Sequence, residues 1–358
     1  GFSGNSEWEL GERGKAVSGT TAAQALKLLE TAAATGDPTM LQAGLRALDF
    51  CNRFDPIPRG GQTWEVPLHT PDVIVAGYLL MGHIRAYELT GDGSWLGKGR
   101  HWAYAGLPFL YSYEVPGTGP GANVSIPWPE SLTGKSDLVF TQPDRHHPTP
   151  WGSIPVFGTS FYRVSWFGNL VQWCGLCWAD SVYSLLRHGD DEVLRAAADG
   201  VVISGIHQTY DKEPYVGLLP DTWHLSSNTA HPALIGPVRV ESPLRQMIDE
   251  PQYGGLHSEV VLAEGRRAHV TSRAVPSALS LAADRLSWTQ RFPVGECCET
   301  MVIGLAAPVT VQVDGRELEK ADDILAVDEG WALLADGQLA LRVKHAAERH
   351  RVEVMYGG

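Results

Sequence analysis

The sequence predicts an α+β protein in which helical hairpins of the (α/α)-toroid kind, forming a complete or a partial ring, precede a small antiparallel β-sandwich. Two observations support this. A helix–turn–helix pattern occurs three times in the first 210 residues, and alternating apolar and polar residues typical of strands replace it after about residue 255. We therefore expect a helical domain over residues 1–250, with a long loop insertion at 112–167, and a β domain over 255–358.

A Gly-Asp pair marks each predicted hairpin, at Gly36-Asp37, Gly91-Asp92 and Gly189-Asp190. Glycine adopts the left-handed conformation that ends one helix, and aspartate caps the next. In each copy a leucine lies four residues after the aspartate, and a small residue (Gly or Ala) lies seven residues after it. The predicted helices are 20–34, 38–53, 71–89, 93–112, 168–187 and 191–209.

The connections between hairpins are long, at about 54–69, 112–167 and 210–240. Because short and long connections alternate, all the long ones should lie at one end of the helices. Loops presented together by a rigid scaffold commonly carry function. We therefore expect any chemistry of this protein to lie on these three loops.

After residue 255 the predicted strands are short and separated by turn signals such as Asp314-Gly315 and Asp336-Gly337. They are 257–263, 268–274, 279–292, 300–305, 309–313, 317–319, 339–343 and 352–355. This pattern is typical of an antiparallel sandwich.

The composition excludes several classes of protein. A net charge of −13 argues against a nucleic-acid partner, because phosphate binding needs clustered Lys and Arg. No run approaches the roughly 20 apolar residues of a membrane span. The chain starts at Gly1 without a signal peptide, so we expect it to be processed or to be part of a longer protein.

The five cysteines are too few for a disulfide scaffold. Cys174 and Cys177 lie within one predicted helix, and Cys297 and Cys298 lie in a predicted strand region. The Cys174-x-x-Cys177 pair lies in the middle of a helix, and no second close cysteine pair with zinc spacing accompanies it. The sequence therefore predicts buried cysteines, no metal and no cofactor.

At two places the sequence resembles the six-hairpin glycosidase-like superfamily. They are the helix entry Trp64–Asp72 (WEVPLHTPD) and the hairpin turn Tyr87–Asp92 (YELTGD), and the helical-then-β order agrees. The resemblance implies a carbohydrate-active enzyme acting on a poly- or oligosaccharide, in an extracellular or periplasmic setting. Three hairpins, not six, are visible. The others would come from an N-terminal companion segment or subunit, or the toroid is partial.

Hydrolysis of a glycosidic bond requires two carboxyl groups, one protonated and one ionised. Glu65, beside Trp64, and Asp221, beside Trp223, are the preferred pair, and Asp72 and His224 are further catalytic candidates. Aromatic and polar residues on the loops are predicted to bind sugar: Trp64, His69, Trp151, Tyr162, Arg163, Trp166, Gln172, Trp173 and Trp223.

Two alternatives remain open. A polysaccharide lyase would use a His or Tyr base and a cation against a uronate, drawn from Arg145, His146, His147, Tyr162, Arg163, His224, Asn228 and His231. A non-catalytic protein would use the same aromatic face to bind a glycan or a partner chain.

Overall fold

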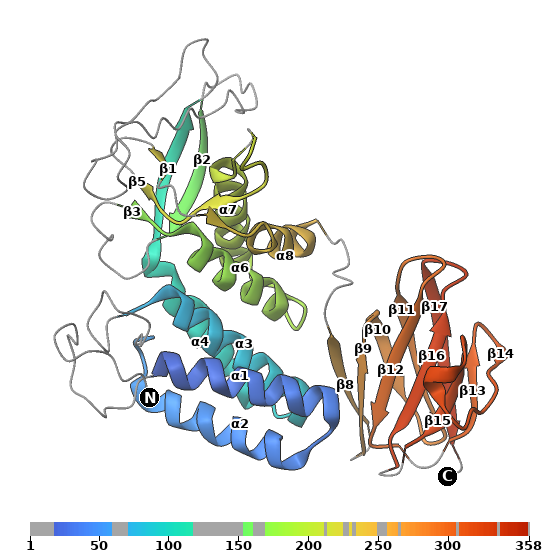
Figure 1. The fold of residues 1–358 in the computed structure, drawn as a ribbon. Coiled ribbons are helices and arrows are strands. Elements are labelled where there is room, and N and C mark those ends of the chain that lie inside the picture. Colours follow the sequence, from blue (N-terminus) through green and yellow to red (C-terminus); the bar gives the residue numbers. More distant parts are fainter. Residues whose placement is uncertain are drawn as a thin grey trace, which may run out of the picture. The chain divides into compact units, whose positions relative to one another are not determined.

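The computed structural model describes residues 18–58, 71–116, 153–159, 169–210, 213–224, 229–230, 234–248, 256–263, 266–305, 308–334 and 337–356 (Figure 1). The chain forms two compact units. The first comprises Gly1–Gln24, Ala47–His83 and Gly97–Ile248, and the second comprises Ala25–Arg46, Ile84–Leu96 and Asp249–Gly358. The protein is of the α+β class, with seven α-helices and two five-stranded antiparallel sheets among the described residues.

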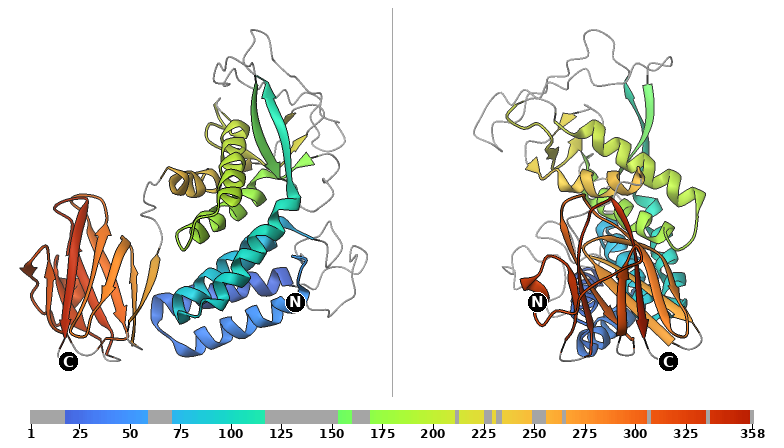
Figure 2. Two further views of the ribbon diagram at one scale, coloured as in Figure 1. Left: turned by 180° about the vertical axis from the view of Figure 1, so that it is seen from behind. Right: turned by 90° about the vertical axis from the view of Figure 1, so that its right-hand side faces the viewer.

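The helices come in sequence-adjacent pairs, as the repeat predicts. The pairs are α1 (Ser18–Thr35) and α2 (Pro38–Cys51), α3 (Val73–Thr90) and α4 (Ser94–Gly106), and α6 (Gln172–Leu186) and α7 (Glu192–Gln208). Helices α1 and α2 lie side by side in Figure 1 and in the left view of Figure 2. A Cβ atom added at Gly44 would lie 2.7 Å from Leu29 Cγ, so the small residue of the repeat permits this close approach. None of the described helices is long and apolar enough to cross a membrane.

The Gly-Asp turns are as predicted in the first two hairpins. Gly36 and Gly91 have positive φ values of 72° and 70°, and Asp37 Oδ1 accepts the N–H of Thr39 at 2.7 Å. The third turn differs. Gly189 is not among the residues with positive φ, and Asp191, one residue later than predicted, caps α7 by accepting the N–H of Leu194.

Replacing Gly91 by Val should destabilise the protein by about 1–2 kcal/mol, because a β-branched residue is strained at positive φ. Gly189→Val is the matched control. The nearest atom to a Cβ added there is Arg100 Nη2 at 3.6 Å, so this change should stay within about 0.5 kcal/mol. Chemical denaturation of both variants measures the difference. An equal loss of unfolding free energy in the two variants would mean that the positive φ of Gly91 does not require a glycine.

Trp178 of α6 is fully buried and joins three helices of the first unit. Its indole N–H donates to the carbonyl of Ala103 in α4 at 3.0 Å. A Cβ added at Gly77 of α3 would lie 3.1 Å from Trp178 Cα, and one at Gly106 would lie 2.1 Å from Trp178 Nε1. Trp178 is therefore a core residue of the first unit.

The ends of several predicted helices were misplaced. Helix α4 ends at Gly106 and is followed by a 3-10 turn at Leu107–Phe109 that contains a proline. Within and just before the predicted loop insertion, β1 (Leu110–Pro116) and β2 (Ser153–Thr159) pair as an antiparallel β-ribbon. Helix α8 (Val238–Met247) was not predicted. The connection before it forms the short strands β4 (Leu219–Pro220), β5 (Trp223–His224), β6 (Thr229–Ala230) and β7 (Leu234–Ile235). Strand β4 pairs with β7, and β5 pairs with β6 and with β3 (Asn169–Leu170), which precedes α6 where the sequence predicted helix.

The sandwich of the second unit consists of sheets ordered β10-β11-β17-β13-β14 and β15-β16-β12-β9-β8. Its strands are β8 (His257–Ala263), β9 (Arg266–Ser272), β10 (Val275–Leu281), β11 (Arg285–Arg291), β12 (Cys297–Ile303), β13 (Pro308–Val313), β14 (Arg316–Glu317), β15 (Gly330–Leu333), β16 (Leu339–Lys344) and β17 (Arg349–Tyr356). The single strand predicted at 279–292 is wrong, because β10 and β11 form a hairpin there. Strand β15 was missed. Asp314 and Gly315 both have positive φ, as their predicted hairpin turn requires.

Within this second unit, backbone carbonyls near the end of α1 accept hydrogen bonds from strand residues. The hydroxyl of Thr271 in β9 donates to Ala33 O at 2.8 Å, and the side-chain amide of Gln338 donates to Thr35 O at 3.1 Å. These bonds satisfy carbonyl groups near a helix C-terminus, where intrahelical partners run out.

Candidate functional site

Asp72 is the most unusual acid of the first unit. It immediately precedes α3, and its Oδ1 accepts the N–H of Ile74 at 2.9 Å. The residue is only 2% exposed, and its Oδ2 has no hydrogen-bond partner in the described part of the protein. Burial raises the pKa of its carboxyl from 3.8 to about 8, against the lowering effect of the backbone N–H groups of Ile74 and Val75. Asp72 is therefore mainly protonated at neutral pH.

Two cysteines and a tyrosine accompany Asp72. Burial, followed by the charges of Asp72, Cys177 and Asp221, raises the pKa of Cys174 well above its usual value. Burial also raises the pKa of Cys177 to about 11 and raises the pKa of Tyr78. All three groups are therefore neutral at pH 7. The charges of Asp72 and Asp221 both contribute to the raised pKa of Cys174. The start of α3, the start of α6 and the residue that follows β4 therefore lie close together.

Asp221 follows β4 and is partly exposed. Its Oδ1 accepts the indole N–H of Trp173 at 3.2 Å. The adjacent Thr222 is 2% exposed, and its hydroxyl has no partner among the described residues. Buried polar atoms without partners are rare in folded proteins and often indicate function.

Arg239 on α8 completes this group. Its Nη1 donates to Cys177 Sγ at 2.9 Å, and its charge acts on Tyr78 and Cys174 as well. We define the Asp72 cluster as Asp72, Tyr78, Cys174, Cys177, Asp221 and Arg239. It combines a protonated acid, a second carboxyl group and a cation.

The structure describes only part of the site predicted from sequence. The following predicted residues lie outside the described residues: Trp64, Glu65, His69, Trp151, Tyr162, Arg163 and Trp166. His224 belongs to β5, but its side chain is not described. Asp72, Asp221 and Trp173 do lie in or beside the cluster.

Two predicted sugar-binding residues lie in the interior. Gln172 is 1% exposed, and its amide donates to Val201 O in α7 at 2.8 Å, so it ties two helices together. Trp223 is 3% exposed and packs with Leu170 and Ala230. Both side chains are as buried as that of Asp72, but their contacts join structural elements, so a structural role accounts for each.

Four members of the cluster were not predicted as site residues. Cys174 and Cys177 were both predicted to be buried, and this is confirmed for Cys174, whereas Cys177 is partly exposed. Tyr78 lies in the largely apolar helix α3, where a tyrosine carries no sequence signal of a site. Arg239 was missed with α8, and its position after a Gly-Pro helix start at Gly236-Pro237 was the available signal.

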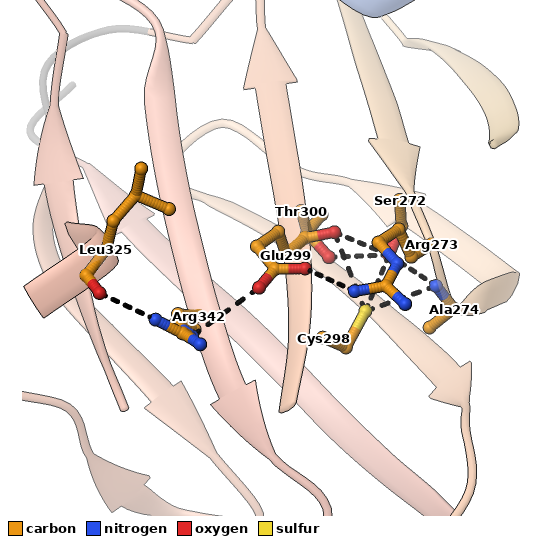
Figure 3. A network of polar contacts seen from close by, with 8 residues as sticks. All are labelled: Ser272, Arg273, Ala274, Cys298, Glu299, Thr300, Leu325 and Arg342. Atoms are coloured by element: carbon orange, nitrogen blue, oxygen red, sulfur yellow. Dashed lines mark hydrogen bonds and ion pairs between the residues drawn. The ribbon is translucent and has the colours of Figure 1, made fainter. Parts of the chain in front are cut away.

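A second polar network lies in the sandwich and includes Cys298 (Figure 3). The N–H of Ala274 donates to Cys298 Sγ at 3.1 Å, and the hydroxyls of Ser272 and Thr300 are 2.6 Å apart. Glu299, on the next position of β12, binds Arg273 at 3.0 Å. These contacts join neighbouring strands, and burial raises the pKa of the Cys298 thiol. The network is therefore structural. Among the described residues no group of His, Cys, Asp and Glu is arranged to hold a metal ion.

No protein-family model matches the chain, and no curated protein is similar to it in sequence. Solved structures are similar at low identity. One is a glycoside hydrolase that is 10% identical to this chain, with a TM-score of 0.32. The alignment covers 94% of this chain and 56% of the glycoside hydrolase. Endoglucanase CelQ from Clostridium thermocellum, complexed with cellotriose, is 11% identical, with a TM-score of 0.30, covering 95% and 70%.

A third is a GH127 β-arabinofuranosidase, 13% identical, with a TM-score of 0.29, covering 93% of this chain and 51% of its own. The chain thus spans little more than half the length of this structure and of the first glycoside hydrolase.

Proposed function

We propose that the protein is a carbohydrate-active enzyme, specifically a glycoside hydrolase whose active site includes the Asp72 cluster. The observation that carries the proposal is the protonated, buried carboxyl of Asp72, which has one oxygen without a partner among the described residues. Hydrolysis requires an acid that is still protonated at neutral pH beside a second carboxyl group in a different environment. The glycoside hydrolases among the similar structures agree with this proposal.

In this mechanism Asp72 donates its proton to the glycosidic oxygen as the bond to the anomeric carbon breaks. Asp221 acts from the other side, either as a base that takes a proton from the attacking water or as the nucleophile. The N–H of Trp173 holds the Asp221 carboxyl in place. The backbone N–H of Ile74 orients Asp72, so that Oδ2 carries the transferable proton.

Glu65 remains a proposed alternative to Asp72 as the acid, because it lies seven positions before Asp72 on the same connection. We also propose that the three hairpins form part of an (α/α) toroid, completed by a companion segment or subunit. The aromatic residues Trp64, Trp151 and Trp166 are proposed to stack on sugar rings.

The test is a screen of the full chain on a glycan panel, with two readouts. New reducing ends report cleavage of either kind, whereas the ultraviolet absorbance of a new C=C bond reports elimination only. We expect reducing ends without this absorbance. A chromophoric product would favour the lyase instead, and a chain inert on all glycans, yet binding some, would favour the non-catalytic alternative.

A further inference from the structure

Arg239 has an unusual environment for an arginine of this protein. It is exposed on the first turn of α8, and its one hydrogen bond among the described residues is to Cys177 Sγ at 2.9 Å. That thiol is neutral at pH 7, because burial raises its pKa to about 11. The positive charge of Arg239 is therefore not compensated by the group it contacts.

Several other arginines of the first unit pair with carboxylates, whereas Arg53 lies over the Phe50 ring with its Cζ 5.5 Å from the ring centroid. Arg100 binds Asp191 at 2.6 Å, and Arg245, on the same helix as Arg239, binds Glu241 at 2.8 Å. Arg239 forms no ion pair with any residue that the structure describes. An uncompensated guanidinium is notable in a chain of net charge −13, where carboxylates are plentiful.

Three acids act on the thiols of Cys174 and Cys177, and none of them forms a described ion pair with Arg239. The charge of Asp180 also raises the pKa of the Cys177 thiol. Its Oδ1 accepts hydrogen bonds from Ser242 Oγ at 2.7 Å and from Gln246 Nε2 at 2.6 Å. Asp221 accepts the Trp173 indole, and Asp72 is mainly protonated at pH 7. The cluster thus holds its proton donor and an unpaired cation together.

We propose that the Asp72 cluster binds an acidic sugar and that Arg239 determines this specificity by pairing with the carboxylate of a uronate unit. A guanidinium matches a carboxylate with two parallel hydrogen bonds, which gives both affinity and orientation. The neutral thiol of Cys177 supports the guanidinium without competing for its charge. This inference rests on the proposed function, since it assigns the substrate class of the same site.

Calorimetric titration of the full chain tests the inference independently of turnover. The probes are tetragalacturonate, a hyaluronan tetrasaccharide as a source of glucuronate, and the carboxyl-reduced form of each. At least one acidic probe should bind roughly 10- to 100-fold more tightly than its reduced form, the usual value of a charge-assisted pair. Arg239→Gln should remove this preference, whereas Arg239→Lys should retain part of it.

Arg245→Gln is the matched control, because it removes an exposed arginine of the same helix and should leave binding unchanged. A preference for acidic probes that survives Arg239→Gln, or the absence of any such preference, overturns the inference. Its failure is separable from that of the proposed function. Hydrolysis of neutral glycans without any acidic preference would refute only the inference, whereas Arg239-dependent binding without cleavage of any glycan would refute only the hydrolase.

Discussion

Asp72→Asn should make the protein more stable and almost inactive. The carboxyl of Asp72 has a pKa of about 8 in the folded protein against 3.8 without burial. The folded state therefore binds more protons than the unfolded state between these values, so the free energy of unfolding falls as the pH rises from about 4 to about 8. Asparagine cannot ionise and also caps helices well. The variant should be more stable than wild type by on the order of 5 kcal/mol at pH 8 and nearly equal to it at pH 4.

The same substitution removes the proposed proton donor, so kcat should fall by about 10²-fold or more. In the wild type, kcat/KM should decline as the pH rises through about 8, because Asp72 loses its proton there. Asp92→Asn is the matched control. Asp92 also precedes a helix and accepts a backbone N–H, from Ser94 at 2.9 Å, but it is exposed. That variant should change neither activity nor the pH dependence of stability.

Denaturant unfolding of wild type and both variants across this pH range provides the stability measurement. A loss of stability in Asp72→Asn at pH 8 would mean that the carboxyl has an ionic partner in the native protein. Undiminished turnover in a folded Asp72→Asn variant would instead transfer the proposed role of acid to Glu65.

The hairpins could be predicted from sequence because their signals are local. A left-handed glycine and a capping aspartate determine the chain direction at Gly36 and Gly91 without help from distant residues. The third turn was only partly predictable, because Asp190 and Asp191 are both suitable caps and the structure uses the second. Asp190 binds Arg195 at 2.7 Å instead.

The candidate site was less predictable because it depends on contacts between distant segments. Asp72 has the sequence signature of an ordinary helix cap, and only its burial distinguishes it from Asp37 or Asp92. Helix α8 contains Pro243, which argues against a helix, so Arg239 was not placed on any element. Its contact with Cys177 spans 62 positions of the sequence, and no local pattern reports such a pair.

Asp221→Asn should lower kcat by about 10²-fold or more while leaving the melting temperature nearly unchanged. The fold should tolerate the change because an asparagine carbonyl still accepts the Trp173 indole N–H, which Asp221 Oδ1 accepts at 3.2 Å. Asp199→Asn is the control. Asp199 likewise accepts one side-chain donor, the Tyr183 hydroxyl at 2.6 Å, but it lies outside the cluster, so activity should persist.

The smaller variant Asp221→Ala separates the two proposed roles of this carboxyl. If Asp221 is a nucleophile, added azide should restore cleavage and yield a glycosyl azide of inverted anomeric configuration, while the wild type retains configuration. If Asp221 is a base acting through water, the wild type should invert the configuration, which proton NMR of the first product detects. Full activity in Asp221→Asn together with a loss of about 10²-fold in Glu65→Gln would remove Asp221 from the mechanism and leave Glu65 as the carboxyl to pair with Asp72.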